Sequence, residues 1–199
     1  MYRCLGKRVF DVSVAVSILV VAALPMLGVA LLIRAKMGAP VLYRHKRTGM
    51  SGAPFEMLKF RTMDLQIPGH ERPSSARITT LGRTLRSLSL DELPQLVNVI
   101  RGDMSLVGPR PLLPDYDSLY SDEQRRRFEV RPGITGLAQV SGRSRLAWGK
   151  KFAFDVTYVD KLSLATDIKI LMATARRLLD RSSTVADGSA IQERFDGTN

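Results

Sequence analysis

Two adjacent carboxylates, Asp91 and Glu92, are the residues of this chain whose type and position point most directly to chemistry. Ser89 precedes them with the spacing of a helix capping box, and an apolar stretch from 93 to 100 follows. The free N–H groups and the dipole of a helix N-terminus favour anions, so we expect Asp91 to be ionised and able to act as a nucleophile. The spacing alone favours an ordinary acidic helix cap, and the wider set of basic residues is what favours a catalytic pair.

Several basic side chains stand beside turns, prolines or glycines instead of along regular charged faces. Arginine presents a fork of donors that matches phosphate oxygens, and a restricted backbone can hold such a fork in place. Each of these residues taken alone could also be a solvated charge, so it is the set that indicates phosphate binding. Its members are Lys59, Arg61, Arg86, Arg110 and Arg143.

The composition limits which classes of partner these charged side chains can bind. The chain has 199 residues, 30 Lys plus Arg against 19 Asp plus Glu, and a formal net charge of +11. The hydrophobic fraction of 45% is that of a globular chain, not a disordered one. A single Cys excludes an internal disulfide, and one Cys with two His argues against a Cys/His zinc site. The excess of positive charge indicates a polyanionic partner: nucleic acid, anionic lipid or a phosphorylated substrate.

An uncharged apolar segment, Val12 to Ile33, separates these possibilities. It is long enough to span a bilayer as a straight helix, but Pro25 lies inside it and basic residues flank both ends. Because Lys and Arg collect on the cytoplasmic side, two basic ends favour a segment that enters and leaves on one face. We therefore predict a re-entrant helical hairpin bent near Leu24-Pro25. A single span, a cleaved signal peptide and a buried core helix are the alternatives.

The remaining chain predicts an α+β fold that is mainly helical. Strands are expected over 41–47 and 55–63, joined by a glycine-rich loop, followed by a polar loop over 65–80. A short basic helix covers 81–87, and the helix that begins at Ser89 should carry Pro94 in its first turn and end near Gly102.

Further helices are expected over 121–129, 148–160 and 164–181, with a glycine-punctuated loop over 131–143 and a polar tail over 182–199. The last helix has an apolar stripe edged by basic residues, which suits either a core contact or an anionic membrane surface. We divide the chain into a membrane hairpin (1–36), a catalytic domain (37–181) and the tail, which form a single fold unit.

Four ordered motifs resemble the bacterial sugar transferase family, the monotopic phosphoglycosyl transferases, in its minimal catalytic form. They are KFRTM (59–63), RSLSLDELPQL (86–96), GDMSLVGPRP (102–111) and RPGITGLAQVSGR (131–143). The closing IQERFDG (191–197) is similar, less specifically, to members that transfer diacetylbacillosamine phosphate in protein glycosylation.

The resemblance implies transfer of a phosphosugar from a UDP-sugar to polyprenol phosphate, normally undecaprenyl phosphate, with release of UMP. Asp91 would be the nucleophile and a ligand of Mg²⁺, with Glu92 as the second carboxylate. The family breaks its membrane helix at Ser-Pro, where this chain has Leu24-Pro25. Phosphate and nucleotide binding fall to Lys59, Arg86, Arg110 and Arg143.

The same resemblance implies a protein in one leaflet of the bacterial inner membrane, with its catalytic domain on the cytoplasmic face. The expected partners are the UDP-sugar, the polyprenol phosphate and anionic lipids, with no nucleic acid; a homodimer is possible. Two other functions remain open from the residues: a basic protein that binds membranes or nucleic acid without catalysis, and a membrane phosphatase that uses the same aspartate.

Overall fold

The computed structural model describes residues 2–66, 73–142, 146–179 and 195–197. Helices dominate, and the strands form two separate two-stranded sheets, which confirms a mainly helical chain with a small β-hairpin. The strands are β1 (Leu42–Thr48), β2 (Pro54–Phe60), β3 (Ser105–Val107) and β4 (Gly133–Thr135). The helices are α1 (Lys7–Met37), α2 (Thr80–Ser87), α3 (Gln95–Arg101), α4 (Asp122–Arg125), α5 (Leu137–Ser141), α6 (Trp148–Asp160) and α7 (Leu164–Leu179).

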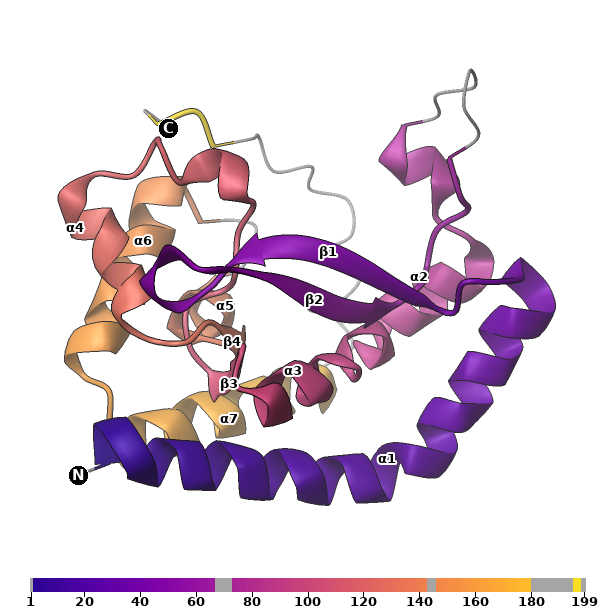
Figure 1. The fold of residues 1–199 in the computed structure, drawn as a ribbon, viewed down its shortest axis with the longest axis horizontal. Helices are drawn as coiled ribbons and strands as arrows, with labels where there is room; N and C mark the ends of the chain where they lie inside the picture. Colours follow the sequence, from indigo (N-terminus) through magenta and orange to yellow (C-terminus); the bar gives the residue numbers. More distant parts are fainter. Residues whose placement is uncertain (1, 67–72, 143–145, 180–194, 198–199) are drawn as a thin grey trace.

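Helix α1 holds the apolar segment and runs along one side of the molecule, beneath α3 and α7, before its axis bends toward α2 (Figure 1). Helical structure continues through Pro25, so the predicted break is a bend and not an interruption. The ring of Pro25 removes one backbone hydrogen bond, which is an ordinary cause of such bending. By length and composition α1 could cross a membrane.

Both ends of α1 pack against the rest of the protein, while its middle does not. Ala15 is buried with residues of α3 and β3, and Ile33 is buried with Phe60 and Leu85. Several apolar side chains near the middle of α1 face outward, and Val21 and Leu24 are 82% and 80% exposed. A soluble core helix would bury these residues, so the alternative of a buried core helix does not fit.

The hairpin crosses the middle of the molecule (Figure 1). Its antiparallel register pairs Leu42 with Phe60 and Thr48 with Pro54, and β2 ends three residues before the predicted limit. At the end of β2 the chain approaches α2 so closely that a Cβ on Gly82 would lie 1.9 Å from the Thr62 carbonyl oxygen. Glycine at this position therefore allows α2 to lie directly on the backbone that follows the hairpin.

Helix α3 is fixed to the hairpin by the side chain of Asn98, which is fully buried. Its Oδ1 accepts a hydrogen bond from Leu58 N at 3.0 Å, and its Nδ2 donates to Glu56 O at 2.8 Å. The helix ends at Gly102 with φ +98°, as predicted. These contacts set α3, and the residues just before it, relative to β2.

The glycine-punctuated segment after Arg131 is more regular than predicted. Residues 133–135 form β4, which pairs in parallel with β3, and α5 follows. The backbones meet closely, since a Cβ on Gly133 would lie 2.1 Å from Gly108 N. The prediction of a loop over 131–143 is therefore wrong for most of that segment, because pairing with a strand 28 residues earlier overrides the local glycine signal.

The charged and C-terminal helices agree with the sequence. Ser121 and Gln124 form the predicted capping box of α4, and α6 covers the predicted 148–160. Phe195 is buried among the rings of Tyr116, Tyr120, Trp148 and Phe152. The tail residues 182–194, including part of the IQERFDG resemblance, lie outside the described residues.

The apolar stripe of α7 is divided between the core and the surface, and its Leu171 packs against the hydrophobic core. Leu164, Ile168 and Met172, spaced at i, i+4 and i+8, are between 41% and 51% exposed, whereas Asp167 and Ile170 are buried. The core contact is therefore confirmed for one side of α7, and the membrane surface stays a prediction for its exposed side.

Candidate active site

Asp91 and Glu92 lie in a 3₁₀ turn, Leu90–Glu92, between α2 and α3. The predicted capping box is wrong: Ser89 has φ +55°, in the left-handed region, and its side chain makes no capping hydrogen bond. Helix α3 begins at Gln95, directly after Pro94, so the two carboxylates precede its N-terminus. The turn is instead held between β2 and α2, both of which it contacts.

Glu92 is held by two cations. Its Oε1 accepts from Lys59 Nζ at 2.6 Å and from Arg110 Nη2 at 3.3 Å. Although burial raises the pKa of Glu92, Arg110 and Lys59 outweigh that effect and bring the pKa to about 2. Glu92 is thus an ionised anchor that brings together Lys59 of the KFRTM motif and Arg110 of the GPRP motif.

Asp91 is the less compensated of the two carboxylates. It is 7% exposed, and none of the described residues forms an ion pair with it within 4 Å. Burial raises the pKa of Asp91, the charge of Glu92 adds to the rise, and the nearby Lys59 and Arg86 oppose it. Asp91 therefore does not lie at the N-terminus of α3 as predicted, and the side chains that favour its charged form are Lys59 and Arg86.

The other basic residues predicted from the sequence to bind phosphate differ in where they lie. Arg86 of α2 donates from Nε to Thr62 Oγ1 at 2.9 Å, which orients it near Asp91. Arg61 is 4% exposed and donates to the carbonyl oxygens of Met37 and Gly38 at the end of α1, so its role is structural. Arg143 lies outside the described residues.

Sequence reasoning missed Arg127, which fixes the backbone of Arg110. Its Nη2 donates to Arg110 O at 2.6 Å and lies 2.9 Å from Asp155 Oδ2, and both side chains are almost fully buried. Arg127 ends a run of three arginines in a charged helical segment, a pattern that reads as solvated surface. No local signal distinguishes it from its neighbours Arg125 and Arg126.

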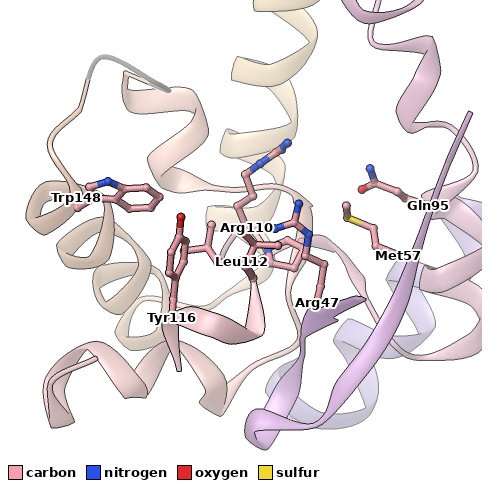
Figure 2. Close-up of a pocket in the computed structure, with 10 residues that line it drawn as sticks. Arg47, Met57, Gln95, Arg110, Leu112, Tyr116 and Trp148 are labelled. Atoms are coloured by element: carbon pink, nitrogen blue, oxygen red, sulfur yellow. The ribbon is translucent and has the colours of Figure 1, made fainter. Parts of the chain in front are cut away.

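Arg110 also lines a cavity of about 190 Å³ (Figure 2). Trp148 and Tyr116 lie at one end of it and Met57 and Gln95 at the other, with the side chains of Arg47 and Arg110 between them. Arg110 connects this cavity to the carboxylate pair, because it lines the cavity and also pairs with Glu92 at 3.3 Å. The arrangement offers a basic cavity beside two carboxylates, which suits a phosphorylated substrate.

The carboxylates also fit a magnesium ion. No group of three or more His, Cys, Asp or Glu side chains suitable for a metal occurs within the described ranges. Mg²⁺ in phosphoryl transfer needs fewer, since one or two carboxylates plus substrate phosphates and water complete its shell. Asp91 has free carboxylate capacity for this role, whereas Glu92 Oε1 is already occupied by two cations.

Comparison with known proteins shows the family to which the chain belongs. A family profile described as bacterial sugar transferase matches residues 2–181. The "Uncharacterized sugar transferase EpsL" of Bacillus subtilis is 46% identical over 194 residues, 96% of each chain. The "UDP-glucose:undecaprenyl-phosphate glucose-1-phosphate transferase" of Caulobacter vibrioides is 42% identical over 88% of this chain and 70% of its own. The "Undecaprenyl-phosphate galactose phosphotransferase" of Salmonella typhimurium is 37% identical over 88% of this chain and 40% of its own.

Proposed function

Because the chain belongs to the bacterial sugar transferase family, we propose that this transferase moves a sugar phosphate from a UDP-sugar to undecaprenyl phosphate and releases UMP. The observation that carries the proposal is the contrast within the carboxylate pair. Glu92 is bound by Lys59 and Arg110, while Asp91 beside it has no ion-pair partner within the described residues. An uncompensated carboxylate among cations suits a nucleophile that attacks phosphorus.

The reaction proceeds in two displacements. In the first, a carboxylate oxygen of Asp91 bonds to the phosphorus that carries the sugar, and the bond from that phosphorus to the bridging oxygen breaks. UMP leaves with this oxygen. In the second, a phosphate oxygen of undecaprenyl phosphate bonds to the same phosphorus and the acyl phosphate bond breaks. Asp91 is restored, and the product is undecaprenyl-diphosphate-sugar.

The cations around the pair offset the charge of two anionic substrates. We assign Lys59 and Arg110 to the phosphates, since both reach the carboxylate next to the nucleophile. Arg86 is placed to assist at Asp91, whose pKa its charge lowers. Mg²⁺ bound at Asp91 would supply further positive charge to the diphosphate. Arg143 stays a predicted phosphate ligand.

We also propose that α1 enters and leaves the membrane on one face. Arg8 near the first end of α1 donates to the carbonyl oxygens of Val99 and Ile100, and Arg61 of the catalytic domain bonds to the last end. A helix whose two ends contact the same domain is difficult to reconcile with a full span. The exposed apolar middle of α1 and the stripe of α7 would lie in the membrane, with the site on the cytoplasmic side.

Cysteine labelling tests this topology. Single cysteines at Arg3 and Lys36, in a chain with Cys4 replaced by Ser, should both resist a membrane-impermeant maleimide in intact spheroplasts. Both should react after the membrane is permeabilised, which serves as the control for their accessibility. Labelling of one position but not the other in intact spheroplasts would establish a single span and contradict the proposal.

A product assay tests the activity. Purified protein in liposomes, with Mg²⁺, undecaprenyl phosphate and a panel of UDP-sugars, should release UMP and form undecaprenyl-diphosphate-sugar in equal amounts. UMP with free sugar phosphate, formed equally well without lipid acceptor, would indicate the phosphatase alternative. Absence of UMP with every UDP-sugar, together with retention on DNA at physiological salt, would favour the basic binding protein instead.

A further inference from the structure

Resting on the proposed function, we infer that Arg47 and Arg110 form one phosphate-monoester site that serves both half-reactions. UMP and undecaprenyl phosphate are both phosphate monoesters, with one terminal phosphate esterified to an alcohol. The site would hold the phosphate of UMP as it leaves and the phosphate of the lipid acceptor as it arrives. Arg47, near the end of β1, would then bind substrate together with the cations that lie near the carboxylate pair.

The surroundings of Arg47 lack an anion. Its Nη2 lies 3.1 Å from His45 Nδ1, its Nε is buried without a hydrogen-bond partner, and no carboxylate of the described residues lies within ion-pair distance. Burial lowers the pKa of His45, with Arg47 contributing, which keeps this ring neutral and able to accept. The contacts of Arg47 therefore leave its charge uncompensated.

A second guanidinium, that of Arg110, lines the same cavity (Figure 2). Burial, and next the charge of Arg110, lower the pKa of Arg47 to about 10, because both disfavour the charged guanidinium. Two like charges facing a cavity of about 190 Å³ are stabilised when an anion binds between them. A neutral sugar ring would not provide this compensation, so the occupant is a phosphate.

The position of the cavity identifies which phosphate binds. Both arginines line the cavity, but Arg110 pairs with Glu92 at 3.3 Å and Arg47 does not pair with it within 4 Å, so Arg47 lies farther from Glu92 than Arg110 does. The phosphate that carries the sugar must meet Asp91. The other phosphate of the donor, which becomes that of UMP, then falls to Arg47 and Arg110.

The same site must receive the acceptor. Attacking and leaving oxygens lie roughly in line in phosphoryl transfer, so UMP departs from the side opposite Asp91. The lipid phosphate displaces Asp91 in the second step and must approach from that opposite side. It therefore enters where the UMP phosphate was. This succession explains how one basic cavity can serve a soluble donor and a lipid acceptor.

The experiment compares Arg47→Met with Arg44→Met, an exposed arginine of the same strand that pairs with Glu56 on the surface. Calorimetry on the full-length protein in nanodiscs measures the affinity for UMP and for uridine. Two exchange assays separate the half-reactions: labelled UMP into UDP-sugar without lipid acceptor, and labelled undecaprenyl phosphate into undecaprenyl-diphosphate-sugar without UMP.

We expect Arg47→Met to lower the ratio of UMP affinity to uridine affinity at least about tenfold. The same variant should slow both exchange reactions at least about tenfold. Arg44→Met should leave all three unchanged. Arg47→Lys, which keeps the charge, should retain part of the preference and shows whether the position tolerates substitution.

An unchanged UMP preference in Arg47→Met, or slowing of only one exchange, would overturn the shared site. If the wild-type protein catalyses neither exchange, the proposed function fails and shared use in catalysis fails with it. The comparison of UMP with uridine still reports separately whether Arg47 binds a phosphate, so the two failures are distinguishable.

Discussion

Replacing Asp91 with asparagine should lower kcat for UMP release by at least about 10⁴-fold, the scale seen when an enzyme loses its nucleophile. Asparagine has nearly the same shape as aspartate, and Asp91 has no ion pair in the described part of the chain, so the fold should survive. The amide cannot form the acyl phosphate that the first displacement requires. Steady-state UMP release with the UDP-sugar identified by the panel measures the effect.

A covalent adduct separates a nucleophile from a carboxylate that acts only through charge. Wild-type protein incubated with UDP-sugar and no lipid acceptor should carry a phosphosugar on the peptide containing Asp91, detectable by mass spectrometry. It should also exchange labelled UMP into UDP-sugar. Asp91→Asn should show neither, whereas Glu92→Gln should still form the adduct, because the role of Glu92 is to hold Lys59 and Arg110.

Asp64→Asn provides the control, since Asp64 is an exposed aspartate in the loop after β2. It should retain wild-type kcat. Asp91→Asn that keeps more than a few per cent of wild-type turnover, or an adduct found on another residue, would remove Asp91 as the nucleophile. A strictly ordered ternary mechanism in initial-rate kinetics would have the same consequence.

Elements with a long periodic pattern could be predicted from the sequence. The long uncharged run predicted α1, the glycine-rich loop between two short segments predicted the hairpin, and the apolar stripe at helical spacing predicted α7. Gly102 also ends its helix as predicted, because a left-handed residue at that position is a local requirement. The four motifs identified the family that the profile match confirms.

Tertiary contacts decided the features that the sequence did not reveal. Strands β3 and β4 have three residues each, too few for alternation to be detected, and they pair across 28 residues. Ser89 has the spacing of a helix cap but adopts φ +55°, because packing of the turn against β2 and α2 determines its backbone.

Charged residues were the hardest to interpret, because a sequence does not show which charges are buried. Arg47 lies on a strand and Arg127 in a charged helix, and both read as solvated side chains. Arg61 stands in the KFRTM motif beside Lys59, yet it binds the end of α1 and not the site. Lys7 is one of the basic residues that precede the apolar segment, and it is buried in the structure instead of solvated.

Replacing Lys7 with methionine should destabilise the protein by about 3–5 kcal/mol, the usual cost of removing one partner from a buried ion pair. Lys7 Nζ lies 2.7 Å from Asp167 Oδ2 and 3.7 Å from Asp11 Oδ1, and Asp167 is fully buried. Within the described residues it is the one cation that pairs with either carboxylate. The hydroxyls of Tyr2 and Tyr158 also donate to Asp167, but they cannot replace a positive charge.

Unfolding of the detergent-solubilised protein measures this cost. The control is Lys36→Met, which makes the same change at an exposed position of α1. Its free energy of unfolding should stay within about 0.5 kcal/mol of wild type. The double variant Lys7→Met/Asp167→Asn should recover part of the loss, because it removes one of the two uncompensated carboxylates. Asp11 accepts hydrogen bonds from the Ser105 hydroxyl and the Leu106 N–H in β3, so this buried cluster joins α1 to the strand that leads to Arg110. A Lys7→Met protein as stable as Lys36→Met would show that α1 is not fixed to the catalytic domain through these charges.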